Sequence, residues 1–175
     1  MTDQLEASLD MVAQGERIEG LAKEVAALKG AFFAALDKAG VSASQVRGIG
    51  VSGQQHGMVA LDADGAPVYP AKLWCDTETS AQNSALVETL GGEAGCLEKL
   101  GLVLQTGYTA SKIAWLRETH PQVYRRIATL LLPHDYLNFW LTGERVAEPG
   151  DASGTGYFDT RTRTWRRDVF ELIAP

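Results

Sequence analysis

Hydrophobic residues recur at spacings of three and four through the first forty residues of the chain. The clearest run goes from Ile18 to Phe32 and continues to Leu36 before Gly40. This period is typical of an amphipathic helix, and glycine commonly ends one. A shorter apolar stripe of the same kind precedes Gly15. We therefore expect the first 40 residues to be mostly or wholly helical.

The chain then alternates between short apolar runs and polar corners. Residues 46–51 and 58–61 are predicted strands, and residues 52–57 form a polar tip between them. Gly53 and Gly57 flank this tip and allow its backbone to come close to something small. Polar side chains at such a corner are presented rather than buried, which suits a polyhydroxylated ligand.

Helical and extended patterns alternate through the remainder of the chain. Helices are predicted at residues 76–90, 93–100, 109–118, 121–127, 134–141 and 165–173. Residues 67–74 form a third extended piece, and residues 128–132 have the continuous apolar character of a buried strand, bounded by Pro133. Residues 148–156 are predicted to form a polar, glycine-rich loop. Strands that alternate with helices favour an α/β fold.

Composition narrows the class of protein. A chain of 175 residues that is 45% hydrophobic has the size of one ordinary domain with a single core. Its net charge of −6 argues against a nucleic-acid or anionic membrane surface. The acidic start lacks the basic flank of a secretory signal, so we expect a cytoplasmic protein. Cys75 and Cys96 lack metal-site spacing and are expected to be reduced thiols.

The sequence matches several common catalytic motifs only in part. The run from Gly50 to Gln54 ends in glutamine where a serine-hydrolase elbow needs glycine. The three histidines lie far apart in the sequence, which argues against a metal site. The glycine-rich loop resembles phosphate-binding loops in composition alone, because it lacks the lysine spacing. Asp151 is a possible cleft residue and general base, or a brace within the turn.

Four residues combine into a candidate sugar site. Gln55 and His56 lie at the polar tip, and Trp74 and Asp76 end the extended piece that follows. An indole face packs against the C–H groups of a sugar ring, while amide, imidazole and carboxylate groups bind its hydroxyls. The alternative is a hydrogen-bonded corner that binds no ligand.

Six short motifs then occur in a characteristic order. They are SGQQHG (52–57), LWCD (73–76), YTASKIAW (108–115), LPHDYL (132–137), TGE (142–144) and DASGT (151–155). Together they resemble the N-terminal half of the xylulokinase branch of the FGGY carbohydrate kinase family, over residues 29–175. The QQHG tip points to xylulokinases, since glycerol kinases typically carry Arg-Glu there.

This resemblance implies a fold, a reaction and a site. The fold is a partial actin-like, ribonuclease-H-like ATPase domain with a mixed sheet and flanking helices, preceded by a helical segment at residues 1–28 without a family match. The reaction is the ATP-dependent, Mg²⁺-assisted phosphorylation of D-xylulose to D-xylulose 5-phosphate. The sugar-binding residues are Gln55, His56, Trp74 and Asp76, and Asp151 lies near the cleft without being the catalytic base.

The resemblance also implies that the chain is truncated at both ends. In similar proteins a phosphate-binding hairpin opens the domain, and the catalytic aspartate and adenosine-binding glycines lie in a second domain. We therefore expect no catalytic residue, no metal ligand and no tight binding of ATP or Mg²⁺ in this chain alone. An exposed sheet edge favours self-association. Two alternatives stay open, namely a non-catalytic fragment or interaction module, and a kinase for ribulose, gluconate or glycerol.

Overall fold

The computed structural model describes residues 30–175, and the chain divides after Gly50 into two units. In the first unit, residues 30–39 are helical and the helix ends at Gly40, whose φ is +65°. This confirms the end of the predicted N-terminal helix. The rest of that prediction lies outside the described residues.

The strand predicted at residues 46–51 is wrong, because these residues join no ladder in the described part of the chain. The side chain of Ile49 is 60% exposed. An apolar run becomes a strand only when a neighbouring strand takes its N–H and C=O groups and one of its faces is buried. The sequence shows the apolar run at residues 46–51, but it does not show whether another strand pairs with that run.

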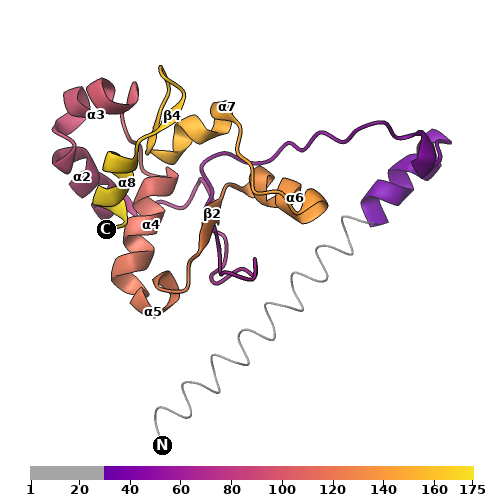
Figure 1. Cartoon of the computed structure of the whole chain (residues 1–175), viewed down its shortest axis with the longest axis horizontal. Helices are drawn as coiled ribbons and strands as arrows, with labels where there is room; N and C mark the ends of the chain where they lie inside the picture. Colours follow the sequence, from indigo (N-terminus) through magenta and orange to yellow (C-terminus); the bar gives the residue numbers. More distant parts are fainter. Residues whose placement is uncertain (1–29) are drawn as a thin grey trace, which may run out of the picture. The chain divides into compact units, whose positions relative to one another are not determined.

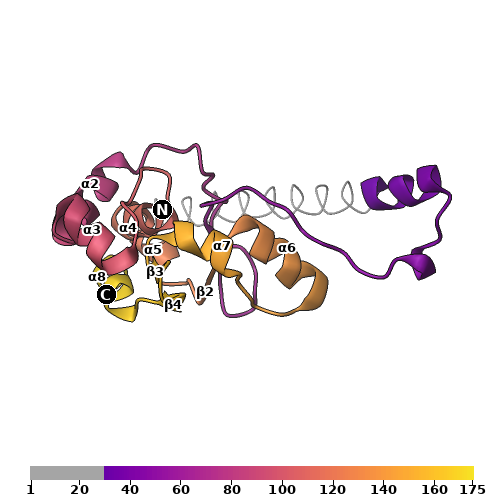
Figure 2. The same cartoon turned by 90° about the horizontal axis from the view of Figure 1, so that it is seen from above.

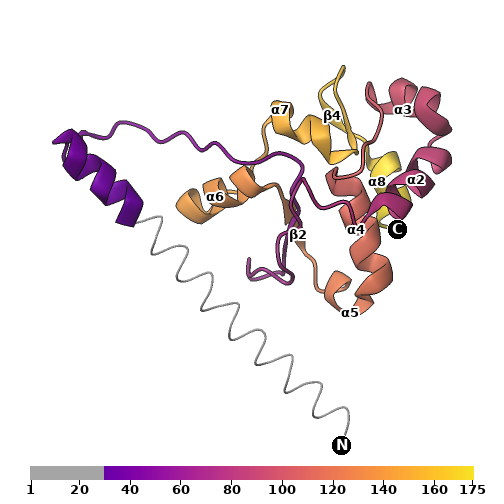
Figure 3. The same ribbon diagram turned by 180° about the vertical axis from the view of Figure 1, so that it is seen from behind.

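In the second unit, β1 (Val59–Leu61) pairs antiparallel with β2 (Thr129–Leu131). This confirms the predicted strand at 58–61 and the buried strand at 128–132. The third extended piece lies along β1 through single bridges from Lys72 to Met58 and from Pro67 to Leu61. β2 lies between α4 and α6 in the views of Figures 1 and 3.

Helices occupy nearly all the positions predicted for them. They are α2 (Ser80–Thr89), α3 (Gly92–Leu100), α4 (Thr109–Thr119), α5 (Pro121–Tyr124), α6 (Pro133–Thr142) and α8 (Arg167–Ile173). The helix α4 packs against α2 and α8, and these three with α3 gather at one end of the second unit (Figure 2). Its buried residues Ile113 and Leu116 belong to the main hydrophobic core. Among the described residues, no helix combines the length and the apolar character that crossing a bilayer requires.

The loop predicted at residues 148–156 is instead helical, with α7 (Pro149–Ala152) followed by the 3-10 turn η2 (Ser153–Thr155). Proline at a first helical position and a carboxylate cap from Glu148 stabilise this short helix. A hairpin of β3 (Phe158–Asp159) and β4 (Thr164–Trp165) follows. Both sheets of the described chain are two-stranded and antiparallel. The described residues thus combine helices and strands, as expected for an α/β fold, but they do not include the expected mixed sheet.

Candidate functional site

The polar tip turns sharply at His56. The φ angle of His56 is +60°, and the N–H of Gly57 donates to the carbonyl of Gln55 at 2.7 Å, which closes a γ-turn around the histidine. Positive φ is uncommon for a residue with a Cβ, and holding it costs about 1–3 kcal/mol. The turn leaves the Gln55 side chain exposed and the His56 side chain half-buried.

The glycines that flank the tip serve the packing of the protein itself. A Cβ on Gly53 would lie 2.8 Å from the Cβ of His134, and one on Gly57 would lie 2.5 Å from the Cγ of Pro133. The tip therefore rests on the first turn of α6. The expectation that these glycines leave space for a small ligand is corrected, because α6 fills that space.

A buried lysine holds the tip from beneath. Lys112 in α4 is 0% exposed, and its ammonium donates to the carbonyls of His56 at 3.1 Å, of Tyr108 at 3.4 Å and of Gly107. The hydroxyl of Thr109 donates to the same His56 carbonyl at 3.3 Å. Burial lowers the pKa of Lys112 to about 8.

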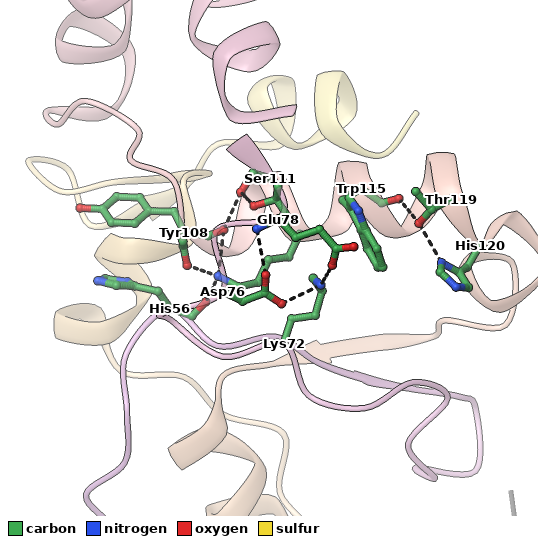
Figure 4. Close-up of polar contacts among 12 residues, drawn as sticks. His56, Lys72, Asp76, Glu78, Tyr108, Ser111, Trp115, Thr119 and His120 are labelled. Carbon is green, nitrogen blue, oxygen red and sulfur yellow. Dashed lines mark hydrogen bonds and ion pairs between the residues drawn. The ribbon is translucent and has the colours of Figure 1, made fainter. Parts of the chain in front are cut away.

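A second buried lysine, Lys72, holds the corner at residues 72–78, where the third extended piece ends. The ammonium of Lys72 lies 2.7 Å from the Oδ2 of Asp76 and 2.8 Å from the Oε2 of Glu78, and 3.8 Å from the ring centroid of Trp115 (Figure 4). Burial acts to lower the pKa of Lys72, but the hydrogen bonds from both carboxylates outweigh it and raise that pKa. The same bond to Lys72 lowers the pKa of Asp76.

The fold brings the main chains of His56 and Trp74, two of the predicted site residues, to one place, the start of α4. A Cβ on Gly107 would lie 2.5 Å from the carbonyl oxygen of Trp74, and the Gly107 carbonyl shares Lys112 with that of His56. The Trp74 side chain is 57% exposed. The charge of Asp76 acts on Lys112 from the neighbouring corner. Their roles in sugar binding stay predictions.

The imidazole of His56 has close neighbours at its face and at its edge. Its ring centroid lies 4.4 Å from that of Tyr108, and a Cβ on Gly154 would lie 1.8 Å from its Nδ1 and 1.9 Å from its Cε1. Burial lowers the pKa of His56, and the nearby charge of Asp151 partly opposes that shift. The ring orientation therefore depends on a glycine in η2.

A buried histidine lies between two aspartates behind the tip. The Nδ1 of His134 is 2.8 Å from the Oδ2 of Asp151, and its Nε2 is 3.0 Å from the Oδ1 of Asp135. Burial raises the pKa of both carboxyl groups, against the opposing effect of His134. Asp151 is buried in this cluster, and its predicted role at a cleft stays a prediction. The fold thus brings His56 and His134 to the same aspartate, although they are distant in sequence.

Lys72, Lys112 and His134 were missed as site residues by the sequence reasoning. The signal for Lys112 was its position in the predicted helix at 109–118. Trp115 and Leu116, three and four residues later, lie on the same helical face, so a lysine among them faces the core. No local signal links Lys112 to His56, because 56 residues separate them.

The glycine-rich segment at residues 148–156 is closed to a phosphate group. Glu148 accepts the N–H groups of Gly150 and Asp151, and the His56 ring covers Gly154, so the glycine-rich segment has no open cradle for a phosphate. No group of three His, Cys, Asp or Glu side chains within residues 30–175 is arranged to hold a metal ion.

Comparison with known proteins gives consistent matches. The model of the FGGY family of carbohydrate kinases, N-terminal domain, matches residues 3–175. The chain is 56% identical over 134 residues to the xylulose kinase of Haemophilus influenzae, covering 77% of this chain and 27% of that protein. It is 40% identical over 140 residues to the xylulose kinase of Streptomyces coelicolor, covering 80% and 29%. The chain thus spans less than a third of the length of these relatives.

Solved structures agree with this result. The xylulose kinase from Bifidobacterium adolescentis superposes with a TM-score of 0.68 at 34% identity, over 73% of this chain and 31% of that one. A structure titled as a xyloylose kinase from Brucella ovis superposes with a TM-score of 0.70 at 34% identity, over 75% and 27%.

Proposed function

Because this chain belongs to the FGGY family of carbohydrate kinases, we propose that it forms the sugar-binding part of a kinase that phosphorylates D-xylulose to D-xylulose 5-phosphate. The observation that carries the choice of sugar is the γ-turn at residues 55–57, which carries Gln55 and His56 in a fixed geometry. The two relatives from Haemophilus influenzae and Streptomyces coelicolor are named xylulose kinases, which supports the same sugar.

In this proposal the four predicted residues divide the work of recognition. The amide of Gln55 and the imidazole of His56 exchange hydrogen bonds with sugar hydroxyls, since both groups donate and accept. The exposed indole of Trp74 packs against the C–H face of the ligand. Asp76 is held by Lys72, so its carboxylate keeps its charge at neutral pH and accepts from a further hydroxyl.

We assign the phosphoryl donor, ATP, and its Mg²⁺ to the kinase as a whole. When bound, they supply the transferred phosphoryl group and neutralise its charge. Because Glu148 and the His56 ring close the glycine-rich segment at residues 148–156, we assign to this part of the chain the binding and orientation of the sugar, and no catalytic base. This chain by itself is therefore proposed to bind the sugar without turnover.

A thermal unfolding series tests the sugar assignment. The chain is heated with millimolar D-xylulose, D-ribulose, gluconate or glycerol, and the His56→Ala variant is treated identically. We expect D-xylulose to raise the unfolding temperature most, because a ligand stabilises the folded state that it occupies, and we expect His56→Ala to lose that increase. Equal responses to all four ligands would reject D-xylulose, and no response to any of them would support the interaction module.

An ATP-consumption assay with D-xylulose tests the proposed lack of turnover. We expect the isolated chain to consume no ATP above the rate seen without sugar. Turnover at the rate of an ordinary kinase would refute this part of the proposal.

We also propose weak self-association through the edge of the β1–β2 sheet. In the described chain β2 pairs only with β1, so its other edge carries N–H and C=O groups outside a ladder. Sedimentation velocity over a range of concentrations measures the association, and a sedimentation coefficient that stays at the monomer value throughout would refute it.

A further inference from the structure

We propose that Lys112 is a positioning residue, which fixes the conformation of the tip that presents Gln55 and His56 and does not itself touch the sugar. The sugar-binding consequence rests on the proposed function. The claim about the conformation of the tip does not, because it concerns the chain without ligand.

The first argument is the match between donors and acceptors. An ammonium group has three N–H donors, and Lys112 directs them at three main-chain carbonyls, those of His56, Gly107 and Tyr108. With its side chain completely buried, Lys112 has no surface left for a substrate. Its effect on a ligand must therefore pass through the groups that it holds.

The second argument is the strain at the residue that is held. His56 has a positive φ that a residue with a Cβ adopts only when its surroundings enforce it. The ammonium of Lys112 and the hydroxyl of Thr109 converge on the His56 carbonyl from α4. These two bonds fix the orientation of the peptide group that follows His56, and the γ-turn closes on that same peptide through the Gly57 N–H.

The third argument is the cost of keeping a charge at this place. Among the described residues, no carboxylate forms an ion pair with Lys112, and Asp76, the acid whose charge acts on Lys112, is paired with Lys72. A methionine would fill the same volume without the cost of burying a charge. The presence of a lysine at position 112 is therefore explained by its hydrogen bonds to the main chain of the tip and of the loop before α4.

The test compares Lys112→Met with a matched control, Lys99→Met. Lys99 also donates its ammonium to a main-chain carbonyl, that of Leu90 at 2.9 Å, but from α3. Both variants are examined by two-dimensional NMR of the amide of Gly57 and the imidazole of His56, and by titration with D-xylulose. We expect Lys112→Met to shift these resonances and to weaken D-xylulose binding about tenfold, since small misplacements carry large costs, and we expect Lys99→Met to change neither.

The outcomes separate this inference from the proposed function. Unchanged Gly57 and His56 resonances in a folded Lys112→Met chain overturn the inference, whether or not the sugar binds. Shifted resonances in a chain that never binds D-xylulose support the positioning role and reject the proposed function. If Lys112→Met does not fold, Thr109→Val decides, because it removes the other donor to the His56 carbonyl while keeping the shape of the side chain. It is then expected to shift the same resonances by less, and no shift overturns the inference.

Discussion

Lys72 and Lys112 are two buried lysines that hold neighbouring parts of the candidate site by different means. Lys72 is paired with two carboxylates, which raise its pKa against the effect of burial. Lys112 donates to three carbonyls, and burial lowers its pKa to about 8. An ion pair thus keeps its charge through the neutral range, whereas a carbonyl clamp weakens in mild alkali. We infer that the corner at residues 72–78 is a permanent brace and that the tip is the more adjustable part.

The largest expected effect is the loss of stability in Lys72→Met. Lys72 is buried, but its partners Asp76 and Glu78 are 29% and 58% exposed, so water screens the carboxylates that the variant leaves behind, and we expect about 2 kcal/mol instead of the 3–5 kcal/mol of a fully buried ion pair. Lys112→Met leaves no carboxylate without its partner and should cost clearly less. Urea unfolding of both variants measures the difference, and equal losses would break the comparison.

The next effect concerns the ring at the tip. Gly154→Ala places a methyl group where the His56 imidazole lies, and overpacking of this kind costs about 1–3 kcal/mol. We expect the ring to be displaced and the D-xylulose response to be lost, while the Lys72 corner is unaffected. Gly48→Ala is the control, since its Cβ would meet nothing within 4 Å. Calorimetric titration with D-xylulose measures the loss, and an unchanged affinity would show that the ring position does not matter.

A pH effect of intermediate size should distinguish the two lysines. Lys112 has a pKa of about 8 in the folded chain and about 10.4 when unfolded. Between these values the unfolded chain binds more protons, so the free energy of unfolding rises with pH. Over the same range the neutral amine has one donor fewer for the carbonyls of the tip, and D-xylulose affinity should fall.

The control for this pH effect is Lys112→Met, in which both trends should disappear. The groups that act on Lys112 are Asp76, Lys72 and Cys75. The variant Cys75→Ser removes the neighbouring thiol, and the pH dependence of stability and affinity should persist in it if Lys112 is the source. Stability and affinity that stay flat from pH 7 to 10 in the unmodified chain would contradict the assignment to Lys112.

The smallest effect separates the two carboxylates of the Lys72 corner. Glu78 is mostly exposed, and an exposed pair contributes at most about 1 kcal/mol, so Glu78→Gln should cost less than that. Asp76→Asn should cost more, because this carboxylate also accepts the N–H of Glu78 at 3.0 Å. Urea unfolding at neutral pH ranks the two variants, and the reverse order would place the brace on Glu78.

The sequence predicted well those features that depend on neighbouring residues. The boundaries of α3, α4 and α6 follow from their apolar periods and from the glycines and prolines that end them. The family resemblance, drawn from six ordered motifs, is confirmed by the family match. The loop predicted at 148–156 was wrong because composition was given more weight than the proline and the acidic cap that begin α7.

What the sequence determined by itself was the family, most of the helices and the polar tip with Gln55 and His56. Only the tertiary structure decided how that tip is held, because the carbonyl of His56 and the ammonium of Lys112 meet across 56 residues of chain. Local propensity disfavours positive φ at a histidine. The conformation therefore depends on contacts with α4 and η2, and these contacts exist only once the chain has folded.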